Sequence, residues 1–172
     1  MQVDQFDVVL ASVHLKAVGH VNTEGDIGKL TREIKLLPQF VKALQAQIPE
    51  EKDLLVLGDF NLEPDENYFD VLRDKMFEPV VPATTPTNIS TNNMKGSRCY
   101  DNIWLSATAA KSFSGAWQVV RTGLTSPWIP DGWSWGGVVS DHCPVWAEFF
   151  VDRDADPEAV NKDVSGLTLN IG

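Results

Sequence analysis

An acid and an amide two positions apart stand out as groups that could do chemistry, in the run Leu54-Leu55-Val56-Leu57-Gly58-Asp59-Phe60-Asn61. A short apolar run that ends at a glycine is typical of a strand buried on both faces. Side chains at i and i+2 of an extended backbone leave the same face, so Asp59 and Asn61 are predicted to point together into the crevice above the strand ends. Because Gly, Asp and Asn also form turns, a plain strand and turn remains the alternative for this motif alone.

Three further segments place a polar, reactive side chain near a predicted strand end, and they carry His14, Asp101, and the pair Asp141 and His142. Carboxylate and amide oxygens suit Mg²⁺ or Mn²⁺, and an imidazole beside a carboxylate suits proton transfer or a charged phosphate oxygen. The sequence has neither a Cys and His cluster with zinc-ligand spacing nor a Gly-x-Ser-x-Gly motif, which disfavours a zinc site and a serine hydrolase. A single histidine after a strand is more often structural, and this alternative stays open for His14.

The elements that must position these groups begin with a β–α–β unit. Segment 6–15 is predicted to be a strand of the buried kind, with His14 near its carboxyl end. Pro38 should kink or divide the helix that follows. A helix between two strands makes them parallel, so both end on one edge and His14 is expected beside Asp59. The helix is indicated by apolar residues at steps of three and four, namely Ile27, Leu30, Ile34, Leu37, Val41, Leu44 and Ile48.

The rest of the chain is predicted to hold a short helix, more strands and two irregular segments. The helix covers 64–74, with Tyr68, Phe69 and Leu72 facing inward, and strands are expected within 99–106, 115–121 and 140–150. Segment 82–98 is a predicted loop. The tryptophan-rich segment 126–137 is interpreted as cover for a core edge, with an aromatic recognition loop as the alternative. Residues 1–151 are expected to form the domain, and 152–172 a disordered acidic tail.

Composition narrows the class of protein. With 172 residues, 43% hydrophobic and 22% charged, the chain is expected to be one soluble domain. A net charge of −10 argues against a broad basic surface for nucleic acid, so a phosphate substrate would need a bound cation. No stretch could span a membrane and no secretory signal is visible, so an intracellular chain is expected. Lys29, Arg32, Lys35 and Lys42 are interpreted as a solvated helix face, and Cys99 and Cys143 as reduced thiols.

Four motifs occur in an order that resembles the endonuclease/exonuclease/phosphatase superfamily: Val13-His14-Leu15, Gly58-Asp59-Phe60-Asn61, Tyr100-Asp101-Asn102-Ile103 and Ser140-Asp141-His142-Cys143-Pro144-Val145. Each motif is short, but four in order are specific. The resemblance implies an α/β (α+β) fold, a four-layer αββα sandwich of the deoxyribonuclease type. It implies hydrolysis of a phosphodiester with Mg²⁺, or with Mn²⁺, and nucleic acid as the substrate, in a DNA repair setting. A phosphoinositide or another phospholipid headgroup is the alternative substrate.

The same resemblance assigns roles to single residues. Asp59 would align or deprotonate the attacking water, helped by Asn61, and Asp101 would orient His142 against the scissile phosphate. The implied catalytic residues are His14, Asp59, Asn61, Asp101 and His142, and the implied metal ligands are Asp141, Asp59 and Asn61.

One departure from the family pattern concerns the metal site. The family places a metal-binding Glu, and an Asn before it, ahead of the strand that ends at His14, yet the thirteen residues before His14 include no Glu. The chain is therefore expected to cover the C-terminal two-thirds of a family domain and to be weak or inactive by itself. A catalytically incompetent form with a binding role is the third hypothesis.

Overall fold

Strands β3 (Val9–His14) and β4 (Leu54–Asp59) pair in parallel and are joined by helix α1 (Glu24–Gln47), which confirms the predicted β–α–β unit. The computed structural model describes residues 1–3, 6–17, 24–90, 92–121 and 140–154. The register pairs Val9 with Leu54 at one end and His14 with Asp59 at the other. Both strands therefore finish at the same level.

The main sheet has four strands in the order β3-β4-β6-β5, with β5 at Glu78–Pro79 and β6 at Asp101–Leu105. Strand β6 runs antiparallel to β4 and begins where β4 ends, so that Asp59 lies opposite Asp101. His14, Asp59 and Asp101 thus occupy one row across three neighbouring strands. Side chains directly opposite each other in a sheet share a face, so the pairing itself brings these groups together.

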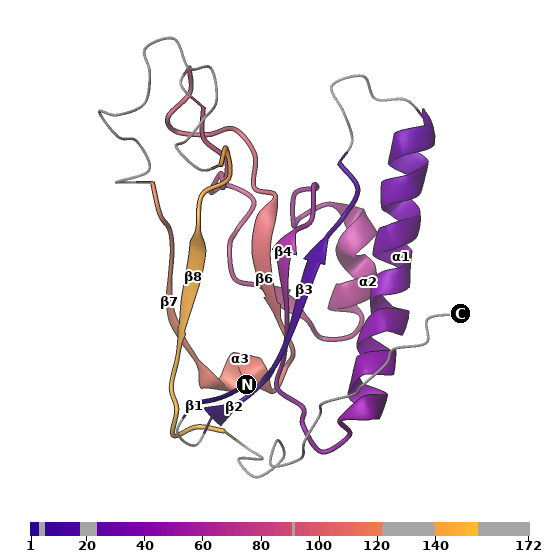
Figure 1. Cartoon of the computed structure of the whole chain (residues 1–172), viewed down its shortest axis with the longest axis vertical. Coiled ribbons are helices and arrows are strands. Elements are labelled where there is room, and N and C mark those ends of the chain that lie inside the picture. The colour runs from indigo at the N-terminus through magenta and orange to yellow at the C-terminus, as the bar shows by residue number, and fades with distance from the viewer. Residues whose placement is uncertain (4–5, 18–23, 91, 122–139, 155–172) are drawn as a thin grey trace.

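The described elements are arranged in three layers (Figure 1). Helix α1, with η1 (Asn67–Phe69) and α2 (Asp70–Arg73), covers one face of the main sheet, and the paired strands β7 (Phe113–Val119) and β8 (Val145–Phe149) lie against the other. Short elements complete the set, namely β1 (Gln2–Val3), β2 (Phe6–Asp7) and α3 (Ala109–Ser112). The α/β/β order corresponds to three layers of the predicted αββα sandwich. Within the described residues no helical layer covers the outer side of β7 and β8.

Two apolar cores hold the layers together. Between α1 and the sheet, Ile34, Val56, Phe69 and Trp104 are at most 1% exposed, and Trp104 packs on Phe69 with ring centroids 5.2 Å apart. The second core fills the space between the sheets. It includes Leu55, Val81, Ile89, Leu105, Val119 and both cysteines. Charged residues at 29, 32, 35 and 42 are exposed on α1, which confirms the interpretation of that face as solvated.

The structure corrects three sequence predictions. Strand β3 is not buried on both faces: it is the edge strand of the sheet, and Leu10 is 46% exposed. Pro38 does not divide α1, which continues through it, because Leu37 and Val41 pack on the sheet on either side of the lost hydrogen bond. Tyr68 was expected to face inward with Phe69, but it is 43% exposed.

Gly58 lets β3 and β4 approach next to the row of polar groups. Its φ is +138°, and a Cβ there would lie 1.9 Å from the Val13 carbonyl oxygen. Gly58→Ala is therefore expected to lower the free energy of unfolding by about 2 kcal/mol or more, because backbone on both strands must shift. Urea unfolding followed by circular dichroism measures this. Gly28→Ala in α1 is the matched control, since nothing lies within 4 Å of a Cβ there; equal losses in both variants would contradict the prediction.

Several predictions lie partly or wholly outside the described residues. The tryptophan-rich segment 126–137 is one of them, and so is most of the predicted tail. Of that tail the structure describes 152–154, where the Asp154 carboxylate accepts a hydrogen bond from the Asp7 backbone N–H.

Cys99 and Cys143 are buried and free, which confirms that they form no bridge. No helix within the described part of the chain has the length and apolar character needed to cross a membrane.

Candidate active site

Asp59 and Asn61 form a closed polar pair at the end of β4. The Asp59 carboxylate accepts the Asn61 backbone N–H at 2.8 Å and its side-chain N–H at 3.0 Å. A second Asn61 side-chain N–H donates to the Leu15 carbonyl at 2.9 Å. Both donors of the amide are thus used within the protein, and since no described residue donates to Asn61 Oδ1, this oxygen can serve as a ligand. The φ of Asn61 is +51°, a left-handed conformation that Asn adopts more readily than most residues.

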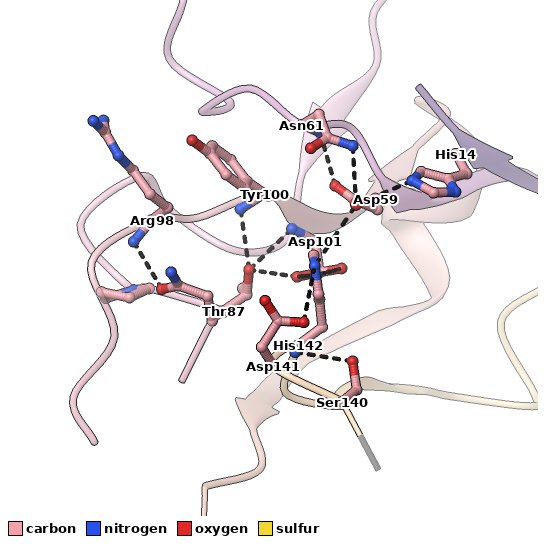
Figure 2. A network of polar contacts seen from close by, with 12 residues as sticks. His14, Asp59, Asn61, Thr87, Arg98, Tyr100, Asp101, Ser140, Asp141 and His142 are labelled. Atoms are coloured by element: carbon pink, nitrogen blue, oxygen red, sulfur yellow. Dashed lines mark hydrogen bonds and ion pairs between the residues drawn. The ribbon is translucent and has the colours of Figure 1, made fainter. Parts of the chain in front are cut away.

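Asp101 is held between a hydroxyl and an imidazole. Its carboxylate accepts the Thr87 hydroxyl at 2.7 Å and the His142 Nδ1–H at 2.9 Å. The Thr87 hydroxyl in turn accepts the backbone N–H groups of Tyr100 and Asp101, both at 3.0 Å. These bonds hold the Asp101 carboxylate in place. It therefore accepts the hydrogen of His142 Nδ1 and fixes the orientation of the imidazole. Nε2 then faces the end of β4 (Figure 2).

Short pairing between two loop segments sets the position of His142. Asn88 and His142 form an isolated antiparallel bridge. On either side of it, the Ile89 N–H donates to the Asp141 carbonyl at 2.8 Å and the Cys143 N–H to the Thr87 carbonyl at 2.6 Å. The entry to β8 is thereby tied to the predicted loop 82–98, which contains no helix or strand among its described residues.

The three groups Asp59, Asp101 and His142 come within reach of one another. Their ligand-type atoms all lie within 4.8 Å, close enough to hold a metal ion. His142 Nε2 lies 3.9 Å from the Asp59 carboxylate, and His14 Nε2 lies 3.5 Å from it. Figure 2 shows His14 on the side of Asp59 away from Thr87 and Arg98. The two histidines therefore approach the same carboxylate.

Two predicted site residues lie at the margin of this cluster. The His14 side chain is 75% exposed, and within the part of the chain that the structure describes it makes a polar contact with Asp59. Asp141 is 62% exposed and lies 4.0 Å from His142 Nε2. Both are brought to the site, but each keeps room to bind a ligand from solvent.

The pKa values of Asp59 and His142 are both raised, for different reasons. The pKa of Asp59 is raised, chiefly by burial, against the lowering effect of the Asn61 hydrogen bond. The pKa of His142 is raised to about 9, chiefly by its hydrogen bond to Asp101, with smaller contributions from the charges of Asp101, Asp59 and Asp141. His142 is therefore an imidazolium at neutral pH when no metal is bound.

A histidine titration tests this arrangement. In EDTA the His142 Cε1–H resonance is expected to titrate near pH 9, and Asp101→Asn should move the midpoint back toward the ordinary value of about 6.5. The fold binds this proton more tightly than the unfolded chain does. Its stabilising effect is therefore complete below about pH 6.5 and is lost as the pH rises through about 9. Loss of the resonance in His142→Gln assigns it among the three histidines of the chain, and a wild-type midpoint below 7, or no shift in Asp101→Asn, would refute the pairing.

Thr87 is the site residue that sequence reasoning missed. Its side chain is fully buried, yet the motif around it, Thr85-Pro86-Thr87-Asn88, reads only as a loop. A threonine in a polar, turn-rich segment carries no signal of its own. Its role follows from the pairing of 87–89 with 141–143, which no local pattern predicts.

Comparisons with known proteins identify relatives of this chain. No family model matches the sequence. The chain is 45% identical over 168 residues to the endonuclease/exonuclease/phosphatase family domain-containing protein 1 of Homo sapiens, a match that covers 98% of this chain and 29% of the relative. The Danio rerio protein of the same name is 50% identical over 109 residues, covering 63% of this chain and 20% of the relative. The chain thus spans less than a third of the length of these curated relatives.

The solved structures that share this fold are of proteins with different names. They include a mannosyl-6-phosphatase from Bacteroides thetaiotaomicron, with a TM-score of 0.57, 17% identity, and coverage of 83% of this chain and 51% of that one. A 3′ phosphatase from Neisseria bound to a product DNA hairpin has a TM-score of 0.54 at 18% identity and covers 81% and 60%. A sphingomyelinase C from Streptomyces griseocarneus has a TM-score of 0.55 at 19% identity, and the match covers 80% of this chain and 51% of that one. At such identities these likenesses establish the fold, and together with the curated relatives they show that the chain belongs to the endonuclease/exonuclease/phosphatase superfamily.

Proposed function

We propose that this chain carries catalytic groups of a Mg²⁺-dependent phosphodiester hydrolase that acts on nucleic acid. The observation that supports it best is the convergence of Asp59, Asp101 and His142, from three separate segments, with their ligand atoms within 4.8 Å. Two carboxylates and an imidazole at that spacing can bind a cation, move a proton and contact a phosphate oxygen. The superfamily relationship supports phosphoester chemistry for this set.

Asp59 is the proposed residue that aligns the attacking water and accepts its proton. Burial raises the pKa of Asp59, which makes its carboxylate a better base than an exposed one. Its hydrogen bonds to Asn61 fix the carboxylate plane, so that a water held by it has one favoured direction. A positioned base of this kind contributes about a hundredfold to ten-thousandfold in rate.

His142 is the proposed donor to the scissile phosphate. Because Asp101 accepts the Nδ1 hydrogen, the Nε2 hydrogen is free to donate to an oxygen near Asp59. An imidazolium in this place stabilises the negative charge that grows on the phosphoryl oxygens during attack. Thr87 holds Asp101 in turn, and it acts as a positioning residue.

The donor set fits a small divalent cation with oxygen ligands. Asp59, the free Asn61 Oδ1 and the exposed Asp141 carboxylate would hold it, and carboxylate and amide oxygens suit Mg²⁺ or Mn²⁺. When bound, the cation would neutralise charge on the transferring phosphoryl group. Asp101 is a weaker candidate as a ligand, since His142 and Thr87 already occupy its oxygens.

Nucleic acid is the proposed substrate, on the support of the DNA hairpin held by the Neisseria neighbour. A phospholipid headgroup is the second candidate, and the sphingomyelinase neighbour favours it. The test is nicking of supercoiled plasmid and incision of an abasic duplex, set against release of phosphocholine from sphingomyelin vesicles. Two forms of the protein are assayed. One is this chain by itself, and the other is this chain fused behind the residues that precede the matching segment in the human relative.

The expected result is Mg²⁺-dependent cleavage of DNA that stops in EDTA and is slower by a hundredfold or more in Asp59→Asn. Incision of the abasic duplex ahead of intact duplex would support a repair substrate. Cleavage that survives EDTA would overturn the proposed chemistry. Phosphocholine release without DNA cleavage would replace the proposed substrate with the phospholipid alternative.

A further inference from the structure

A cavity of about 310 Å³ opens beside the candidate active site and shares one residue with it. That residue is Asn61, which also donates to the Asp59 carboxylate. The cavity is lined from three directions, by α1, by the segment after β4, and by the segment before β6. Figure 2 shows Arg98 and Tyr100 on one side of Asn61 and His14 on the other. Its volume lies at the lower end of the range for small-molecule sites.

Two residues whose exposure contradicts the sequence pattern line this cavity. Ile27 belongs to the apolar stripe of α1 and Tyr68 to the predicted inward face of the next helix. Both were expected in the core, yet they are 38% and 43% exposed. Apolar and aromatic surface left open beside a polar site is characteristic of a ligand pocket.

Tyr100 is the best-placed ring in the cavity, since its backbone is fixed on both sides. Its N–H donates to the Thr87 hydroxyl at 3.0 Å, and its carbonyl accepts the Phe60 N–H at 2.8 Å. Tyr100 is half-buried and lines the cavity together with Asn61, on the segment that leads into β6 at Asp101. A substrate whose phosphate lies between Asp59 and His142 would therefore extend its neighbouring group toward a rigid aromatic surface.

The charged residues of the cavity lining are one arginine and two glutamates, namely Arg98, Glu63 and Glu66. Arg98 lies 3.4 Å from Glu63, and both residues line the cavity. The guanidinium offsets the Glu63 carboxylate, and the choline ester in the test below probes whether the remaining carboxylate, Glu66, attracts a cation instead. Together the pair still offers hydrogen-bond donors and acceptors at the wall, which suits the polar edge of a nucleobase.

We infer that this cavity is a nucleoside subsite, in which Tyr100 stacks on the base or sugar attached to the scissile phosphate and Arg98 with Glu63 contacts its polar edge. The inference rests on the proposed phosphodiester hydrolysis and names the group that it recognises. Tyr100 is a specificity-determining residue in this scheme. Stacking on one ring is expected to change selectivity about tenfold.

The test compares three diesters that share a p-nitrophenolate leaving group and differ in the other ester: thymidine 5′, methyl and choline. The wild-type kcat/KM should favour the thymidine ester over the methyl ester about tenfold or more. Tyr100→Ala should bring that ratio close to one, and Tyr100→Phe should keep it, because Phe retains the ring. A wild-type ratio near one, a ratio that Tyr100→Ala leaves intact, or a preference for the choline ester would each overturn the subsite.

Binding separates the subsite from the chemistry. Titration calorimetry with thymidine 5′-monophosphate and with methyl phosphate is expected to favour the nucleotide about tenfold in wild type and in Tyr100→Phe, and not in Tyr100→Ala. If the protein hydrolyses none of the diesters but shows this binding preference, the subsite is supported and the proposed function is refuted. If it hydrolyses all three diesters at equal rates and binds both phosphates equally, the proposed function is supported and the subsite is refuted.

Discussion

Asp59→Asn is expected to lower kcat for phosphodiester hydrolysis by a hundredfold or more and to leave the fold intact. The substitution keeps the shape of the side chain but removes the charge and the basicity that the proposed mechanism needs. Asp59 also meets Asn61, His14 and His142, so its loss removes the carboxylate common to all three contacts. Initial rates with and without Mg²⁺ measure the effect.

The matched control for that experiment is Asp74→Asn, which removes a carboxylate from an exposed residue at the end of α2. It should leave the rate within about twofold, as surface changes away from a site usually do. Thermal unfolding of both variants shows whether the fold is retained. A fall of less than tenfold in a folded Asp59→Asn protein would contradict the role given to this residue.

The second large effect is expected from removal of His142. Because His142 is hydrogen-bonded to Asp101, the effects of substituting the two residues on kcat should not be additive. His142→Ala should lower kcat by a hundredfold or more, since the donor to the phosphate is lost. Asp101→Asn should also cost a large factor, because the imidazole loses the acceptor that fixes its orientation. Groups that act as a unit have non-additive effects. The double variant should therefore be little worse than His142→Ala alone.

The double-mutant cycle also distinguishes orientation from an independent role of the acid. If Asp101 binds the cation itself, its removal should cost as much in the His142→Ala background as in wild type. Multiplicative losses would therefore contradict the reading of Asp101 as an orienting acid. Thr87→Val completes the set, and it should reproduce part of the Asp101→Asn effect by removing one hydrogen bond to that carboxylate.

The elements predicted well from sequence are those with a local signal. The apolar run before Asp59 predicts β4, and the stripe through Ile34 and Val41 predicts α1, because burial on one or both faces dictates residue type along each element. Parallel pairing then follows from the crossover. These steps place His14 next to Asp59 without any knowledge of the other strands.

The features that were missed depend on partners far away in the chain. Nothing in the residues of β3 says that no strand pairs with its outer edge, so the exposure of Leu10 could not be read from the apolar pattern. Thr87 gains its role only when its segment pairs with the one that carries His142. Tyr68 fits a helical inward position, yet it lines a cavity that forms from three separate segments.

The measurement that bears most directly on the proposed chemistry is hydrolysis of a defined phosphodiester in ¹⁸O-labelled water with Mg²⁺, followed by mass spectrometry of the products. Attack by a water aligned at Asp59 predicts one ¹⁸O in the product phosphate and none in the released hydroxyl, with labelled phosphate forming at least about a hundredfold more slowly in Asp59→Asn. Label in the hydroxyl product, or cleavage that incorporates no label, would contradict the account. The first would mean that water attacks carbon instead of phosphorus, and the second that a group other than water attacks.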